Sequence, residues 1–144
     1  MSGNRPIIYW DSCVFLAWLK DEKRKAGQMA GVQSCVIEIE SGKWELITSA
    51  IAFTEVLEAK IGSDINKKFQ ELFLRPNITA INADIRVAKL ASELRGYYIK
   101  SGEVRSLTTP DAIHLATAIL YDADEFHTFD DGKSNKKYLG LLDS

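Results

Sequence analysis

Four acidic residues stand where their carboxylates could share one site. Asp11 follows the apolar run Ile7–Trp10, Glu55 lies among apolar neighbours in AIAFTEVLEA, Asp111 follows Thr-Pro, and Asp130 follows the expected strand 125–129. Clustered carboxylates repel one another, so they coexist in the ionised form when a divalent cation joins them. Oxygen ligands without cysteine or histidine favour Mg²⁺ or Mn²⁺. Such ions orient a phosphodiester and activate water, so this pattern indicates metal-dependent phosphodiester hydrolysis.

Each acid also has a simpler interpretation. Asp11 could cap a helix, although Ser12 could do the same. Asp111 could complement a helix dipole and Asp130 could belong to a turn. Glu55 could form a structural salt bridge, but a cation explains a mid-helix carboxylate among apolar neighbours more simply. Taken together the acids favour a shared site, in which like charges should raise the pKa of Asp11.

The elements expected around these acids alternate between strands and helices. We expect strands at 7–11, 44–48, 78–81 and 125–129, and helices at 12–19, 29–42, 49–60, 63–74, 82–98 and 109–121. For the last helix, Thr109 is expected at the cap and Pro110 at the first helical position. This alternation predicts an α/β fold with a parallel sheet covered on both faces. Ligands bind such sheets outside the carboxyl ends of the strands. Three of the four acids flank such ends, and Asp111 occupies a helix N-terminus.

Length and composition favour one globular domain spanning 1–144. The chain has 46% hydrophobic and 26% charged residues and a formal net charge of −2, so no overall positive field indicates a nucleic-acid partner. Local basic residues could still contact RNA phosphate, although solvated loops are the simpler interpretation. These candidates are Arg105, Lys133, Lys136 and Lys137.

Other residue types point to an intracellular protein. Cys13 and Cys35 are isolated in apolar helical patterns and are interpreted as reduced core residues. The longest apolar run, 13–19, is too short to span a bilayer, and no signal peptide precedes the first strand. We therefore expect a soluble, cytoplasmic protein. His114 is interpreted as a packing or hydrogen-bonding residue rather than as a base.

Four segments together resemble the PIN-domain ribonucleases, and among them the VapC-like toxins of type II toxin–antitoxin systems. The similarity spans almost the whole chain. It is carried by IIYWDSCVFLAWL, TSAIAFTEVLEAK, LTTPDAIHLATAIL and FHTFDDGK. The resemblance implies a three-layer α/β/α sandwich with a mostly parallel central sheet. It also implies hydrolysis of RNA with one or two Mg²⁺ or Mn²⁺ ions, homodimers, and silencing by a cognate antitoxin.

The resemblance also assigns roles to individual residues. Asp11, Glu55 and Asp111 would hold the metal, and Asp130 would hold it directly or through water. Ser12 and Thr128 would orient ligands or water by hydrogen bonds. The neighbouring Asp131 leaves the identity of the fourth ligand open.

Two other functions are consistent with the sequence. One is a housekeeping RNA-processing nuclease, which would differ from a toxin in having no antitoxin reading frame directly upstream. The other is a catalytically silent module that binds RNA or protein, which a metal titration would identify. Retention of all four acids argues against the silent module.

Overall fold

The computed structural model describes residues 5–20, 28–100 and 107–128 of the chain. In chain order the elements are β1 (Ile7–Trp10), α1 (Ser12–Leu19), α2 (Gln28–Glu40), β2 (Glu45–Ser49), α3 (Ile51–Glu58), α4 (Ser63–Leu72), β3 (Ile78–Ile81), α5 (Ile85–Lys100), α6 (Thr109–Leu120) and β4 (Glu125–His127). The alternation expected from the sequence is confirmed over these ranges.

The four strands form one parallel sheet in the order β3-β2-β1-β4. The chain builds outward from β1 to β2 and β3, and then returns to place β4 on the other side of β1. Tyr9 therefore pairs with Ile47 on one side and with Phe126 on the other. The point where the strand order reverses, between β1 and β4, is where open α/β sheets form ligand-binding crevices.

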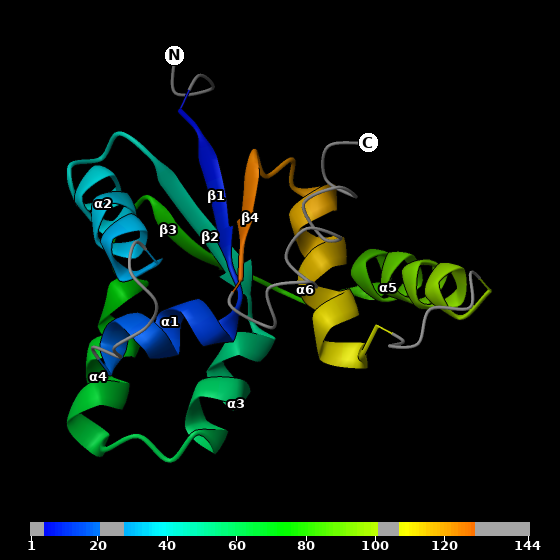
Figure 1. The fold of residues 1–144 in the computed structure, drawn as a ribbon, viewed down its shortest axis with the longest axis horizontal. Coiled ribbons are helices and arrows are strands. Elements are labelled where there is room, and N and C mark those ends of the chain that lie inside the picture. Colours follow the sequence, from blue (N-terminus) through cyan, green and yellow to red (C-terminus); the bar gives the residue numbers. More distant parts are fainter. Residues whose placement is uncertain (1–4, 21–27, 101–106, 129–144) are drawn as a thin grey trace.

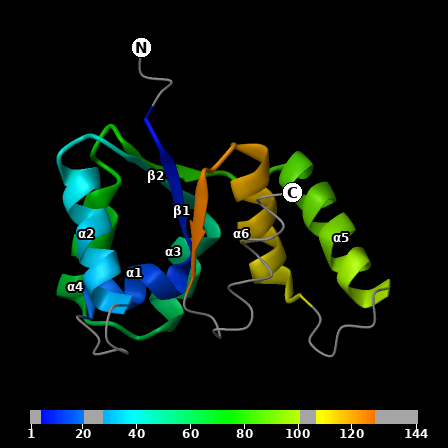
Figure 2. The same ribbon diagram turned by 45° about the horizontal axis from the view of Figure 1, so that its top comes forward.

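Helices cover both faces of the sheet, which confirms the three-layer arrangement. Figures 1 and 2 show α1 to α4 on one side of the strands and α5 and α6 on the other. Side chains alternate across β1, so Ile8 and Trp10 enter one apolar core while Tyr9 enters the second. Adjacent residues of one short strand are thereby assigned to opposite layers.

Some helix boundaries differ from those expected. The helix expected from residue 82 begins at Ile85, because the Asp84 side chain accepts hydrogen bonds from the backbone N–H groups of Arg86 and Val87 at 3.1 Å. The helix expected to reach Lys60 ends at Glu58, and Lys60 has a φ of 56°.

The N-terminus of α6 is displaced by one residue from the expected position. Thr108, and not Thr109, is the N-cap, and its side chain accepts a hydrogen bond from the backbone N–H of Asp111. Pro110 accordingly occupies the second helical position. The Thr-Thr-Pro sequence offers two cap candidates, and the local pattern did not distinguish them.

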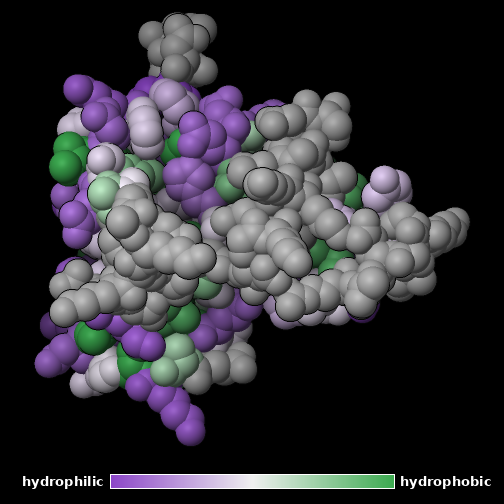
Figure 3. Space-filling view, in the orientation of Figure 1, coloured by the Kyte–Doolittle hydropathy of each residue, from purple (hydrophilic) through white to green (hydrophobic). Residues whose placement is uncertain are grey.

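Among the described residues, no helix is long and apolar enough to cross a membrane. Figure 3 shows apolar side chains on one face scattered among hydrophilic ones. Leu74, which follows α4, is the most exposed large apolar residue in the part of the chain that the structure describes, at 83%.

Candidate active site

Asp11 lies at the carboxyl end of β1 and caps α1. Its backbone is extended, with φ −83° and ψ 177°, and its Oδ1 accepts hydrogen bonds from Val14 N at 3.4 Å and from the Cys13 thiol at 2.8 Å. The side chain is buried, with the residue only 5% exposed. The capping role weighed for this aspartate is therefore real, and Ser12 begins the helix as its first residue.

The buried position changes the acidity of Asp11. Burial raises the pKa of the carboxyl above its usual range, while hydrogen bonds with Cys13 and Thr128 and the charge of His114 oppose that rise. The upward direction is the one expected. Its principal cause is desolvation, however, and not repulsion between acids.

Thr128 adjoins Asp11 because the carboxyl ends of β1 and β4 are neighbours. Trp10 pairs with His127, so the next residue of each strand emerges at the same edge. Thr128 is buried, and its Oγ1 lies 3.4 Å from the Cys13 sulfur. Cys13, which the sequence indicated as a core residue, is instead half-buried beside this edge. Its position two residues after Asp11, in the first turn of α1, could have indicated that it lies near the site.

Glu55 lies in α3, the helix that follows the carboxyl end of β2. Its Oε1 is 2.6 Å from Nε2 of His114. The glutamate side chain is 26% exposed, whereas that of His114 is 2% exposed. The structure therefore contains a structural partner for Glu55, which was its alternative interpretation, and it confirms His114 as a hydrogen-bonding residue.

The other ring nitrogen of His114 contacts Tyr9. The tyrosine hydroxyl lies 2.6 Å from Nδ1, and Tyr9 is fully buried between the sheet and α6. Burial raises the pKa of Tyr9 well above its usual value, so the hydroxyl keeps its proton at neutral pH. Sequence reasoning missed Tyr9, because its position in β1 indicates only a core strand residue.

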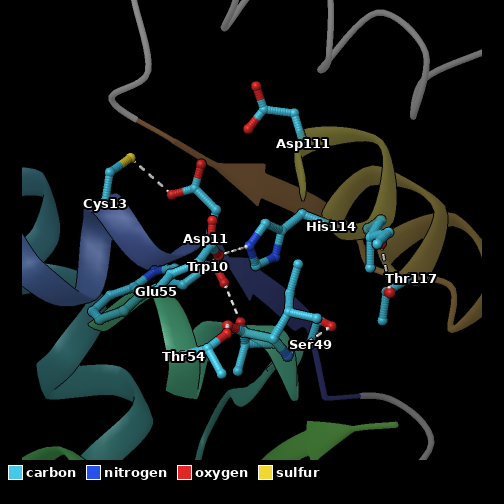
Figure 4. A network of polar contacts seen from close by, with 12 residues as sticks. Trp10, Asp11, Cys13, Ser49, Thr54, Glu55, Asp111, His114 and Thr117 are labelled. Carbon is cyan, nitrogen blue, oxygen red and sulfur yellow. Dashed lines mark hydrogen bonds and ion pairs between the residues drawn. The ribbon is translucent and has the colours of Figure 1, made fainter. Parts of the chain in front are cut away.

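Asp111 lies in the first turn of α6 and is half-buried. Figure 4 shows Asp11 and Asp111 projecting to the same side, above the imidazole of His114. The dipole of α6 favours a negative charge at this end of the helix. Both interpretations of Asp111, as a helix-dipole partner and as a member of the acidic site, therefore agree with its place.

The carboxylates supply the donor chemistry that Mg²⁺ and Mn²⁺ prefer. Within the described ranges, however, no three or more His, Cys, Asp and Glu side chains form a group that could hold a metal ion as they stand. The fourth acid, Asp130, and its neighbour Asp131 lie outside the described residues, as do Arg105, Lys133, Lys136 and Lys137. The donor types of Asp11, Glu55 and Asp111 fit a hard cation.

Comparison with known proteins identifies the family. The model of the PIN domain family matches residues 8–137. A search of curated protein sequences finds no match.

Solved structures share the fold at low sequence identity. VapBC2 from Rickettsia felis, bound to a promoter DNA fragment, has a TM-score of 0.64 at 14% identity, with 90% of this chain and 92% of that chain covered. The sarcin–ricin loop cleaving toxin VapC20 of Mycobacterium tuberculosis has a TM-score of 0.64 at 15% identity, with 88% of this chain and 92% of that chain covered. FitAcB from Neisseria gonorrhoeae has a TM-score of 0.61 at 18% identity, with 94% of this chain and 93% of that chain covered.

Proposed function

Because this chain belongs to the PIN domain family, we propose that it is a Mg²⁺- or Mn²⁺-dependent endoribonuclease and the toxin of a type II toxin–antitoxin pair. The observation that carries the proposal is the convergence of Asp11, Glu55 and Asp111 from three elements on the surroundings of one buried histidine. Asp11 and Asp111 project to the same side of His114, and Glu55 contacts it directly. A buried carboxylate such as Asp11 is costly, and a bound cation would offset that cost.

Each residue has a distinct role in the proposed hydrolysis. Asp11, Glu55 and Asp111 would hold the metal, with Asp130 directly or through water. The ion would supply orientation of the phosphodiester, activation of water and stabilisation of the leaving oxygen. Ser12 and Thr128 would orient ligands or water by hydrogen bonds.

The basic residues belong to substrate binding. Lys133, Lys136, Lys137 and Arg105 are proposed to bind RNA phosphates, because a chain with a net charge of −2 must recruit RNA through local positive charge. The likeness to VapC20, a toxin that cleaves the sarcin–ricin loop, supports RNA as the substrate class.

The proposed partners follow from the structural neighbours. Their antitoxin complexes, VapBC2 and FitAcB, support a cognate antitoxin for this chain. We also propose a cytoplasmic homodimer. Size-exclusion chromatography with light scattering would test the dimer, and co-purification with the product of the neighbouring gene would test the antitoxin.

A catalytically silent PIN module is the second candidate. It is favoured by the Glu55–His114 contact, which satisfies one carboxylate oxygen without metal, and by the absence of a preassembled ligand group among the described residues. A silent module would bind RNA or protein without requiring the acids to converge.

One experiment separates these candidates. The full chain, purified with and without the neighbouring gene product, is incubated with total RNA in Mg²⁺, in Mn²⁺ and in EDTA. We expect cleavage with either ion, none in EDTA and recovery on adding excess Mg²⁺, because the ligands are hard oxygen donors. Robust cleavage in EDTA would exclude the metal mechanism. RNA left intact in Mg²⁺, together with no heat of Mg²⁺ binding by calorimetry, would favour the silent module.

A further inference from the structure

A buried chain of hydrogen bonds connects the strand that carries Asp11 with the helix that carries Glu55. Tyr9, from β1, contacts Nδ1 of His114 at 2.6 Å, and Nε2 of His114, from α6, contacts Oε1 of Glu55 at 2.6 Å. Three elements thus meet at one imidazole. Tyr9 lies two residues before Asp11 in the sequence. These hydrogen bonds therefore connect Glu55 with the end of β1 after which Asp11 follows.

The direction of the bond to Glu55 follows from its chemistry. A carboxylate that binds a metal has no hydrogen to donate, so the proposed arrangement requires Nε2 of His114 to be the donor to Glu55. The imidazole is also held at its other edge by the Tyr9 hydroxyl, and the Tyr9 ring is fixed by stacking on Phe126, with centroids 5.2 Å apart and an interplanar angle of 7°. Both ring nitrogens are therefore held, Nδ1 by a core tyrosine and Nε2 by a partly exposed glutamate.

We propose that His114 is a positioning residue that, anchored by Tyr9, holds the Glu55 carboxylate in place for metal binding. This inference rests on the proposed function of the acids. Glu55 projects from α3 with its side chain 26% exposed, and the imidazole holds its Oε1 at 2.6 Å. Neither His114 nor Tyr9 needs to contact the RNA or the metal.

The histidine ring nitrogens provide a readout that is independent of catalysis. The chain has two histidines, so a His127→Gln variant identifies the His114 signals in ¹⁵N spectra of the full-length protein in EDTA. We expect Nε2 of His114 to carry a proton. An unprotonated Nε2 would overturn the proposal, because it could not donate to Glu55.

Magnesium affinity, measured by calorimetry, tests whether the anchoring matters. Tyr9→Phe keeps the stacked ring and removes only the hydroxyl, so we expect the Kd for Mg²⁺ to rise about tenfold. The variant should still fold in EDTA but melt at a lower temperature, because Nδ1 of His114 loses its buried partner. Tyr98→Phe is the matched control, because Tyr98 is also buried in the second core but lies in α5. Its Kd should match that of the wild type.

Substitutions of the histidine complete the test. His114→Gln retains an N–H donor and should preserve more Mg²⁺ affinity than His114→Leu, which has none. If wild-type protein binds Mg²⁺ and cleaves RNA, but Tyr9→Phe and His114→Leu bind Mg²⁺ equally well, only the positioning proposal fails. If the wild-type protein does not bind Mg²⁺, the proposed function fails and this inference fails with it.

Discussion

Asp11 caps a helix with a buried carboxylate, a group whose burial costs free energy. Its Oδ1 caps α1 through Val14 N, which an asparagine oxygen could do equally well. The negative charge is not needed for this cap, and burial disfavours the ionised form of the carboxyl. We infer that the charge, as distinct from the oxygen, serves the proposed metal site.

Asp11→Asn should therefore abolish RNA cleavage without lowering stability in EDTA at pH 7. The folded pKa of Asp11 is raised, so its ionised form destabilises the native state above that pKa, and the penalty fades as pH falls through it. Asparagine has no such penalty at any pH. In thermal melts in EDTA at pH 7, we expect the melting temperature of the mutant to equal or exceed that of the wild type. The difference in melting temperature should narrow as the pH falls to about 4.

In saturating Mg²⁺ the wild type should melt at a higher temperature than Asp11→Asn. At about 100 times the Kd, bound Mg²⁺ stabilises the wild type by about 2.7 kcal/mol, and the mutant should gain much less. If Asp11→Asn instead melts lower in EDTA and keeps its nuclease activity, the aspartate is a cap or salt-bridge residue and the ligand assignment is wrong.

At the scale of elements, the start of α6 determines where Asp111 is placed. Thr108 accepts a hydrogen bond at 3.3 Å from the backbone N–H of Asp111 itself. The cap thus satisfies an orphan donor of the helix and fixes the backbone of a candidate metal ligand at the same time.

Thr108→Ala should destabilise the protein by about 1 kcal/mol, because it removes the side-chain cap of α6. Thr109→Ala is a matched control, since Thr109 is also exposed but is the first helical residue. Urea denaturation of both variants measures the difference. Equal losses, or a larger loss for Thr109→Ala, would contradict the assignment of Thr108 as the N-cap.

At the scale of the whole molecule, aromatic packing holds the helices on one face of the sheet together. Phe69 of α4 contacts Phe15 of α1 and Phe53 of α3 edge to face, with centroids 5.3 and 5.0 Å apart. Phe69 is completely buried. The helix that carries Glu55 and the helix that begins after Asp11 are therefore joined through α4.

Phe69→Ala should cost about 3–5 kcal/mol, because it removes a buried aromatic ring and leaves a cavity between three helices. Leu74→Ala, at an 83% exposed residue after the same helix, should change stability by no more than about 0.5 kcal/mol. Urea unfolding monitored by circular dichroism measures both. A loss below about 1 kcal/mol for Phe69→Ala would contradict its role as the aromatic contact among these helices.

The sequence by itself determined the elements, the parallel α/β class and the places of the described acids along the chain. These features depend on local patterns, such as the apolar run at Ile7–Trp10, the helical spacing in α5 and the Thr-Pro signal before Asp111. Where two residues could perform the same local task, as Thr108 and Thr109 could, the pattern left a one-residue ambiguity.

Only the tertiary structure decided which residues meet. His114 and Glu55 are 59 residues apart in sequence, and Tyr9 and His114 are 105 apart, so no local pattern could predict these contacts. They arise because α6 packs on the face of the sheet that Tyr9 enters, while α3 follows the carboxyl end of β2, the strand beside β1. Burial, which raises the pKa of Asp11, is likewise a property of the assembled layers, since desolvation depends on everything packed around a group and not on its neighbours in the chain.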